Sequence, residues 1–193
     1  MKVLVVVDMQ NDFVTGVLGT LEAQSIVPNV VKKIEEFCKE DKHNIIFFTQ
    51  DTHDENYLET EEGKNLPVAH CIKKTEGWDL IPEFEKFMAR FKFNMIRKET
   101  FGSDDLGYRL ENLDGDIDIE SVELIGVCTD ICVISNAIIA KSALPNVPIY
   151  IDASCCAGVT PEAHDKAIDL MKNSLQIHIL NEGEEPWRDN YEG

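Results

Sequence analysis

Gly126-Val127-Cys128-Thr129-Asp130-Ile131-Cys132-Val133 joins an apolar run at residues 121–125 to a run of helical character at residues 131–143. A glycine turn between a strand and a helix places the first helical amides at the carboxyl end of the strand, where open α/β sheets bind ligands. Cys132 falls in the first turn of that helix, where the positive end of the helix dipole favours a thiolate. The unpaired amides of the same turn can hold a developing oxyanion. A lone cysteine is more often buried and inert, so a nucleophile here requires a base and a cation from elsewhere in the chain.

The composition indicates one α/β domain spanning residues 1–193, large enough for a substantial core. No apolar run is long enough to span a membrane, and the apolar start of the chain predicts a first strand and not a signal peptide. The six cysteines show neither metal-finger spacing nor a disulfide framework, so we expect a reducing, cytoplasmic setting. The net charge of −18 disfavours nucleic acid and anionic membranes as partners, and solubility explains it.

Strand-like and helix-like runs alternate along the chain. The predicted strands are residues 2–7, 44–49, 93–97, 121–125, 147–152 and 175–180. The predicted helices are residues 26–39, with Pro28 near the start, 80–91, 105–113, 131–143 and 161–173, the last with Thr160 as N-cap. Residues 11–23 and 51–77 are predicted loops, and residues 181–193 form an acidic tail without periodicity. This order predicts a three-layer α-β-α fold with a six-stranded, mostly parallel sheet.

Two charged residues follow other predicted strands and are candidates for the base and the cation. Asp8 ends the first strand, where a carboxylate can accept the thiol proton and later return it to a leaving group. Lys98 ends the third strand, where an ammonium can stabilise a thiolate. Taken alone, Asp8 is also compatible with an ordinary turn residue, and Lys98 with a solvated lysine. Because the carboxyl ends of parallel strands share one edge, we expect both side chains beside Cys132.

A candidate metal site follows the second predicted strand. Asp51 and His53 are two residues apart, so in an extended segment they point to one side. A carboxylate and an imidazole suit a divalent ion, zinc above all, and His70 in the following loop would add a third ligand. Glu62 is a possible fourth ligand, although it lies in a glutamate-rich loop where a solvated side chain is the alternative. Asp-x-His alone is also compatible with two ordinary surface residues.

In combination, three motifs resemble the isochorismatase-like cysteine hydrolases. They are Asp8-Met9-Gln10-Asn11-Asp12-Phe13, Lys98, and the stretch from Gly126 to Cys132. The likeness extends through Asp152 to the helix that bears His164, and so covers most of residues 1–180. It implies a six-stranded parallel sheet and an Asp–Lys–Cys triad formed by Asp8, Lys98 and Cys132. It also implies a non-proline cis peptide bond before Cys128 and an oxyanion hole made by the amides of Cys128 and Cys132.

Within that family, the metal pattern resembles the nicotinamidases. Their Asp-x-His and a later His bind an ion that meets the pyridine nitrogen of the substrate, and these positions match Asp51, His53 and His70. The chain departs from the pattern at residues 66–70, which read Leu-Pro-Val-Ala-His in place of Trp-Pro-x-His, and at residues 100–103, which lack the usual Tyr. The candidate walls of the substrate pocket are then Phe13, Trp78 and Phe101.

The sequence therefore predicts a cysteine-dependent amidohydrolase that converts a small aromatic carboxamide to an acid and ammonia through a thioester, with nicotinamide as the leading substrate. Three alternatives stay open: a vinyl-ether hydrolase of the isochorismatase type, which needs no metal, a hydrolase of carbamoyl amides, and a non-catalytic module that binds a metal or a partner. Release of ammonia indicates the amidohydrolase, and release of pyruvate indicates the vinyl-ether hydrolase. Slow alkylation of Cys132 indicates the non-catalytic module, because an inert buried cysteine reacts slowly. We expect a homo-oligomer that binds neither nucleic acid nor membrane.

Overall fold

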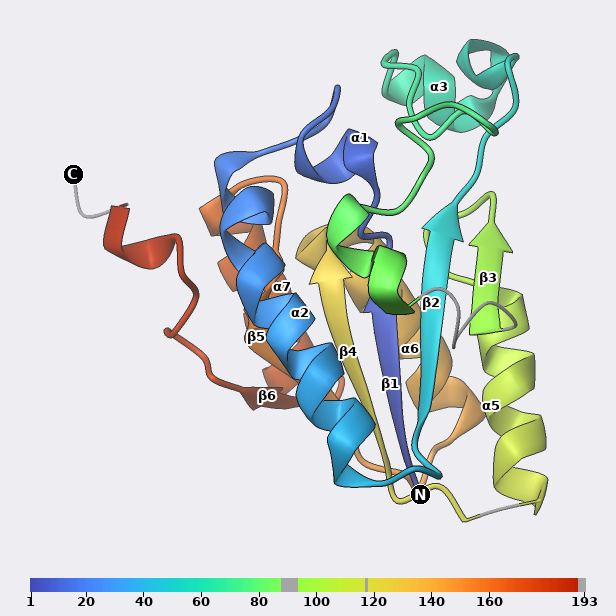
Figure 1. The fold of residues 1–193 in the computed structure, drawn as a ribbon, viewed down its shortest axis with the longest axis vertical. Helices are drawn as coiled ribbons and strands as arrows, with labels where there is room; N and C mark the ends of the chain where they lie inside the picture. Colours follow the sequence, from blue (N-terminus) through green and yellow to red (C-terminus); the bar gives the residue numbers. More distant parts are fainter. Residues whose placement is uncertain (88–93, 117, 191–193) are drawn as a thin grey trace.

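The strands of the protein form one sheet in the order β3-β2-β1-β4-β5-β6 in a computed structural model, which describes residues 1–87, 94–116 and 118–190 (Figure 1). The strands are β1 (Lys2–Val7), β2 (Ile45–Asp51), β3 (Met95–Lys98), β4 (Ser121–Val127), β5 (Ile149–Ala157) and β6 (His178–Leu180). Every pairing between these described strands is parallel. The chain order therefore reverses beside β1, which places the carboxyl ends of β1 and β4 at the centre of one edge.

Helices cover both faces of the sheet. They are α1 (Asn11–Val14), α2 (Leu21–Glu40), α3 (Glu61–Asn65), α5 (Asp104–Asp116), α6 (Ile134–Ala143) and α7 (Pro161–Asn173). Short turns are the 3₁₀ segments η1 (Tyr57–Glu59), η2 (Pro82–Phe84) and η5 (Arg188–Asn190) and the π-helical η4 (Thr129–Val133). Helices α5, α6 and α7 lie on one face, and α2 lies on the other (Figure 1).

The central strand β1 shows why the sheet is buried on both sides. Successive side chains of a strand point to opposite faces, so Val3, Val5 and Val7 pack in the core beneath α5, α6 and α7. Leu4 and Val6 pack in the core beneath α2. A continuous apolar run is the pattern of a strand covered on both faces. The predicted three-layer α-β-α fold with a six-stranded sheet is confirmed.

Helix α2 begins earlier than predicted. The Thr20 side chain accepts a hydrogen bond from the Ala23 amide, 3.0 Å away, and caps a helix that starts at Leu21 and not at residue 26. Pro28 therefore lies inside the helix, although an interior proline removes a hydrogen bond and costs about 3 kcal/mol. The buried stripe of Ile26, Val30 and Ile34 against the sheet outweighs that cost. The prediction of a loop at residues 11–23 is wrong, because these residues contain α1 and the start of α2.

Several other helices and strands begin or end at residues that differ from the prediction. β5 runs to Ala157, well past its predicted end, because a register shift beyond Leu124 lets it continue beside the end of β4. The predicted loop at residues 51–77 holds η1 and α3. The predicted helix at residues 80–91 is seen as η2 followed by helical residues 85–87. Its remaining residues, and the start of the predicted strand at 93–97, lie outside the described residues, and β3 is described from Met95 to Lys98.

Within the described ranges, no helix combines the length and apolar character needed to cross a bilayer. The six cysteines all fall in those ranges, and free thiols are found at Cys71, Cys128, Cys132, Cys155 and Cys156. These free thiols agree with the cysteine spacing in the sequence, which shows no disulfide framework.

Candidate active site

The carboxyl edge of the sheet gathers the predicted base, cation and nucleophile. Asp8 directly follows β1, Lys98 is the last residue of β3, and Cys132 lies in η4, the turn that follows β4. Lys98 Nζ lies 2.6 Å from Asp8 Oδ2 and 3.6 Å from Cys132 Sγ. Lys98 Nζ also lies 3.2 Å from an oxygen of Asp51 at the end of β2. The structure thus brings together three residues that are at least 34 positions apart in the chain.

Burial sets the protonation of this group. It raises the pKa of the Asp8 carboxyl, and Lys98 offsets that effect only in part. Burial also raises the pKa of the Cys132 thiol. The nearby Asp8 raises this pKa further, and Lys98 lowers it. Burial alone would lower the pKa of Lys98, but the nearby Asp8, Cys132 and Asp51 outweigh it and raise that pKa.

Burial therefore favours the thiol form of Cys132, in opposition to the helix dipole, which favours the thiolate. Desolvation of a buried sulfur is the largest influence on its pKa. A carboxylate whose own pKa is raised is a suitable base for such a thiol, because the two proton affinities are closer together.

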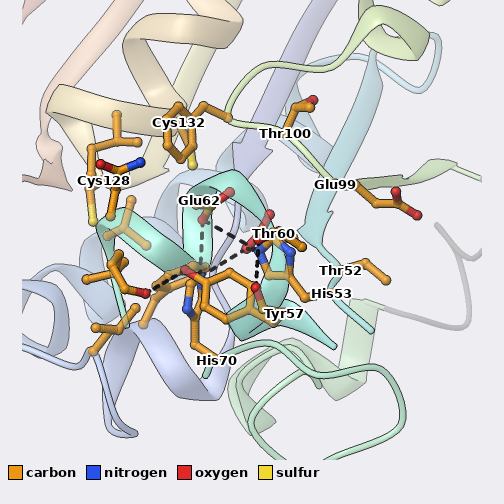
Figure 2. A pocket seen from close by; sticks show the side chains of 18 of the residues that line it. Thr52, His53, Tyr57, Thr60, Glu62, His70, Glu99, Thr100, Cys128 and Cys132 are labelled. Carbon is orange, nitrogen blue, oxygen red and sulfur yellow. Dashed lines mark hydrogen bonds and ion pairs between the residues drawn. The ribbon is translucent and has the colours of Figure 1, made fainter. Parts of the chain in front are cut away.

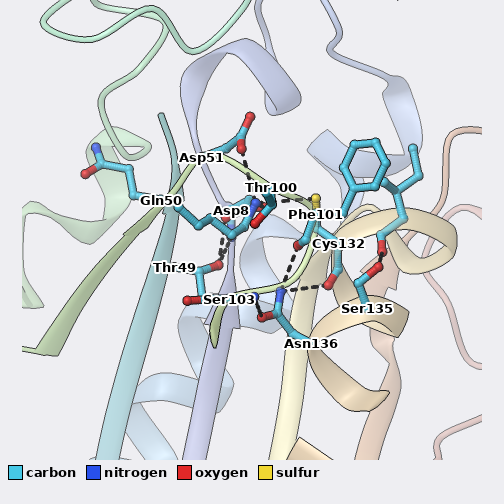
Figure 3. A network of polar contacts seen from close by, with 12 residues as sticks. Asp8, Thr49, Gln50, Asp51, Thr100, Phe101, Ser103, Cys132, Ser135 and Asn136 are labelled. Atoms are coloured by element: carbon cyan, nitrogen blue, oxygen red, sulfur yellow. Dashed lines mark hydrogen bonds and ion pairs between the residues drawn. The ribbon is translucent and has the colours of Figure 1, made fainter. Parts of the chain in front are cut away.

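Thr49 supports Asp8 from the neighbouring strand, a role that no local motif indicated. Its hydroxyl donates to Asp8 Oδ1 at 2.7 Å and accepts from the Asp8 amide at 3.2 Å (Figure 3). Asp8 has a positive φ of 47°, a conformation that aspartate tolerates better than most residues. The carboxylate is held from both sides, by Thr49 and by Lys98.

The turn that carries Cys132 is built on a close backbone approach. Gly126 has φ +116°, and a Cβ there would lie 2.1 Å from the Val7 carbonyl oxygen. The Val127–Cys128 peptide bond is cis, as the family resemblance implied. The following turn η4 is π-helical, with the Val133 amide donating to the Cys128 carbonyl at 3.0 Å. The α-helix therefore begins at Ile134, three residues later than the predicted start at 131. Single π-turns of this kind are frequent at functional sites.

Asn136 ties this turn to the loop after β3 and is a further residue that the sequence did not single out. It is fully buried, and its Nδ2 donates to the carbonyl of Cys132 at 2.8 Å and to that of Phe101 at 3.2 Å. Its Oδ1 accepts from the Ser103 amide at 3.1 Å (Figure 3). Its position one turn after Cys132 is the only local signal of this role.

A second cluster lies next to Lys98. One ligand atom each from Asp51, His53 and His70 lie within 4.8 Å of one another, and all three residues are buried. Figure 2 shows the two histidines of this cluster together with Glu62. His53 Nε2 lies 2.9 Å and His70 Nε2 lies 3.5 Å from Asp51 Oδ2. Glu62 Oε1 lies 3.7 Å from the first nitrogen and 3.8 Å from the second, so it stands at the edge of the cluster.

The donors of this cluster fit a divalent ion. His53 Nε2 is buried and faces the Asp51 carboxylate at 2.9 Å. His70 Nδ1 lies 2.8 Å from the Val68 carbonyl, so it donates there and leaves Nε2 as an acceptor facing Asp51. The imidazoles and Lys98 hold the pKa of Asp51 below its usual range although burial opposes this. Two neutral imidazoles and a carboxylate are a ligand set that zinc takes in proteins.

The hexapeptide at residues 8–13 holds this cluster in place. Gln10 Nε2 donates to the Asp51 carbonyl at 2.9 Å, and its Oε1 accepts from the Asp51 amide at 2.7 Å. Asp12 Oδ2 accepts from the Cys71 amide at 2.7 Å, and the Cys71 carbonyl in turn accepts from the His53 amide at 3.0 Å. The motif that carried the family resemblance thus contributes support as well as the candidate base.

A cavity of about 1050 Å³ opens in front of both clusters. Phe13 and Phe101 line it, as predicted, together with the metal-site residues. Cys128 and Cys132 lie on the other side of the cavity from His53 and His70 (Figure 2). Trp78 is not among its lining residues, which corrects the prediction for that side chain. The Trp78 indole instead donates to the Thr52 hydroxyl at 2.9 Å, and the Arg97 guanidinium lies 4.9 Å from its ring.

Comparison with known proteins finds similarity over nearly the whole chain. The family model of the isochorismatase domain matches residues 2–182. An uncharacterized isochorismatase family protein from Bacillus subtilis is 29% identical over 188 residues, which cover 92% of this chain and 98% of that protein. The pyrazinamidase/nicotinamidase structure from Streptococcus mutans matches with a TM-score of 0.79 and 28% identity, over 93% of this chain and 100% of that one. The pyrazinamidase of Pyrococcus horikoshii in complex with zinc matches with a TM-score of 0.73 and 28% identity, over 93% and 98%.

Proposed function

The chain belongs to the isochorismatase family, and from this premise we propose that it is a cysteine-dependent amidohydrolase which converts a small aromatic carboxamide to its acid and ammonia. One observation carries the proposal: the Lys98 ammonium contacts both the Asp8 carboxylate and the Cys132 sulfur, directly beside a cluster suited to a metal ion. The nicotinamidase and pyrazinamidase structures that match this chain support the amide substrate.

In the proposed reaction, Asp8 takes the proton of the Cys132 thiol while Lys98 stabilises the negative charge that forms on sulfur. The sulfur attacks the carboxamide carbon, and Asp8 returns the proton to the departing nitrogen, which leaves as ammonia. Asp8 then removes a proton from water, which attacks the thioester, and the acid leaves as the Cys132 thiol is restored. One water is consumed for each ammonia released, and the enzyme returns to its initial state.

The oxyanion of each tetrahedral intermediate would be held by the amides of Cys128 and Cys132. Both residues line the cavity. Cys132 lies in η4 and Cys128 directly precedes it, and Asn136 holds this turn through the Cys132 carbonyl. Preorganised amides of this kind stabilise charge that develops only in the transition state, which raises kcat more than binding.

Asp51, His53 and His70 would hold a divalent ion, zinc by the nature of their donor atoms. When bound, such an ion would supply a Lewis-acid contact for a ring nitrogen of the substrate and so orient the carboxamide. The relative from Pyrococcus horikoshii in complex with zinc supports this choice of metal. Glu62 and a ligand from solvent or substrate are the candidates for further coordination.

Nicotinamide is the leading substrate, since its ring nitrogen and carboxamide match the two clusters. The cavity, at about 1050 Å³, is at the upper end of the range for drug-sized ligands, so larger aromatic carboxamides fit as well. Phe13 offers an apolar face for a ring, and Leu66 lines the position where nicotinamidases carry a tryptophan. We also retain homo-oligomerisation and a cytoplasmic location as predictions.

The test is ammonia release by the purified protein from nicotinamide, pyrazinamide, benzamide and N-carbamoyl amino acids. We expect turnover of at least one aromatic carboxamide. Cys132→Ala should lose all turnover, while Cys156→Ala, a buried cysteine of β5, should keep it. Full activity in Cys132→Ala would refute the mechanism, and pyruvate release from a vinyl ether without ammonia release from any amide would assign the other chemistry of the family.

A further inference from the structure

A chain of buried polar contacts joins the C-terminal segment, residues 181–190, to the turn that carries Cys132. His164 Nδ1 of α7 lies 2.8 Å from the Thr129 hydroxyl, and His164 Nε2 lies 3.2 Å from Glu185 Oε1. Thr129 and His164 are fully buried, and Glu185 is 3% exposed. The proposed reaction uses none of the three side chains. Buried polar groups that face no ligand are costly unless each has a partner, so their arrangement calls for an explanation.

The segment is firmly attached where it reaches His164. Trp187 is 3% exposed, packs in the core beneath α2, and meets the His164 ring edge-on with 5.1 Å between ring centroids. Arg188 pairs with Glu185 and reaches Asp165 at 2.6 Å. Burial opposes ionisation of Glu185, but hydrogen bonds from His164 and Arg188 outweigh it and lower its pKa to about 2. Glu185 is therefore a carboxylate at neutral pH.

That charge determines which way the hydrogen bonds run. A carboxylate only accepts hydrogen bonds, so His164 Nε2 must carry a proton and donate it to Glu185. In the neutral ring Nδ1 is then an acceptor, and the Thr129 hydroxyl donates to it. The carboxylate orients the imidazole, and the imidazole orients the threonine, as an outer partner orients the histidine ligands of metal sites.

Thr129 is the first residue of η4 and directly follows Cys128. The same turn is held a second time, since Asp130 Oδ1 accepts from the Val159 amide at 3.0 Å. The approach is close: a Cβ on Gly158 would lie 2.8 Å from the His164 amide nitrogen and 2.9 Å from Asp130 Oδ1. A shift of His164 would therefore move Thr129, and with it the neighbouring amide of Cys128.

We propose that Thr129, His164 and Glu185 form a positioning relay through which residues 181–190 hold η4 and the adjoining amide of Cys128 in their active geometry. The relay rests on the proposed function, because it acts on the turn that carries Cys132. Its members touch neither the substrate nor the reacting atoms, so their effect reaches the reaction only through the placement of η4. A merely structural role would instead lower the stability of the fold and leave kcat unchanged.

The test measures kcat and KM for ammonia release from the most rapidly hydrolysed of nicotinamide, pyrazinamide and benzamide, well below the melting temperature of each variant. Thr129→Val keeps the shape and removes the hydroxyl. It should lower kcat about 10–100-fold, the scale of loss when a catalytic group is misplaced by a fraction of an ångström to an ångström, and should change KM much less. Thr129→Ser restores the hydroxyl and should restore most of kcat. Glu185→Ala, which leaves His164 Nε2 without its acceptor, should lower kcat by a smaller factor than Thr129→Val.

Two control variants test whether any change in residues 181–190, or any loss of stability, is sufficient to lower kcat. Glu182→Ala removes a surface ion pair with Lys172 in the same segment and should keep wild-type kcat. Ile168→Val trims a buried core residue of α7 and should lower the melting temperature with kcat unchanged.

The outcomes of this test are distinct. If wild-type protein is active, wild-type kcat in Thr129→Val and Glu185→Ala overturns the relay, as does an equal loss of kcat in Ile168→Val at matched loss of stability. Failure of Thr129→Ser to recover kcat also overturns it. Absence of ammonia from all three amides in wild-type protein refutes the proposed function, and the relay with it.

Discussion

Replacement of Lys98 by methionine tests the electrostatic arrangement of the site most directly. Lys98 is 4% exposed, and its ammonium lies 2.6 Å from Asp8 and 3.2 Å from Asp51. At an effective dielectric constant of about 20, two unit charges 2.6 Å apart attract by roughly 6 kcal/mol. Relaxation and residual solvation reduce this, and breaking a buried ion pair from one side typically costs about 3–5 kcal/mol. We expect Lys98→Met to lose this much free energy of unfolding, and to lose turnover because the sulfur has no cation beside it.

A double-mutant cycle makes the prediction quantitative and guards against simple unfolding. Asp8→Asn alone leaves the ammonium facing a neutral amide, whereas Asp8→Asn with Lys98→Met removes both charges of the pair. The free energies of unfolding, from urea titrations of all four proteins, should show the double variant destabilised by clearly less than the sum of the two single variants. Ammonia release should be lost in all three variants. Additive losses, or turnover retained in Lys98→Met, would refute the interaction on which the mechanism depends.

Three further predictions address the metal, the substrate and the C-terminal segment. Purified protein should contain a divalent ion, expected to be zinc from the ligand set, and a His53→Ala, His70→Ala double variant should lose it. Elemental analysis that finds no ion in protein never exposed to chelator would contradict the site. Nicotinamide should exceed benzamide in kcat/KM by about one to two orders of magnitude, since benzamide leaves the metal contact unmet, whereas equal values would show that the ring nitrogen is not recognised. Hydrogen bonds from His164 and Arg188 outweigh burial and lower the pKa of Glu185 from 4.5 to about 2, so its contribution to stability is present above about pH 4.5 and is lost as the pH falls toward 2. Urea midpoints of wild-type protein should therefore fall more steeply than those of Glu185→Gln over this interval, and parallel curves would contradict this role.

The motifs predicted which residues meet at the sheet edge better than they predicted the walls of the cavity. Asp8, Lys98 and Cys132 each stand at or just after the end of a strand, and strand ends can be recognised from where an apolar run stops. Trp78 was assigned to the pocket from its residue type alone, and no local pattern indicates that its indole donates to the Thr52 hydroxyl. The direction of a loop side chain depends on contacts with distant residues, so sequence pattern carries little information about it.

The supporting residues were missed for a related reason. Asn136 and Thr49 are ordinary polar residues within a helix and a strand, and their roles appear only once Ser103 and Asp8 lie against them. Glu185 lies in a tail whose sequence is acidic and aperiodic, yet the buried Trp187 and the hydrogen bond to His164 attach it to the fold. Such contacts join positions far apart in the chain, and neither periodicity nor spacing records which partner a buried polar group will find.

The amino-acid sequence alone determined the layers of this protein and the edge at which its chemistry lies. Alternating apolar runs of period 2 and 3.6 specify strands and helices locally, and parallel connection then places every strand end at one edge. Tertiary structure alone decided the raised pKa of the Cys132 thiol and the attachment of Glu185 to His164. Each of these depends on burial against residues remote in sequence, and the free energy of burial is a property of the packed fold and not of the local chain.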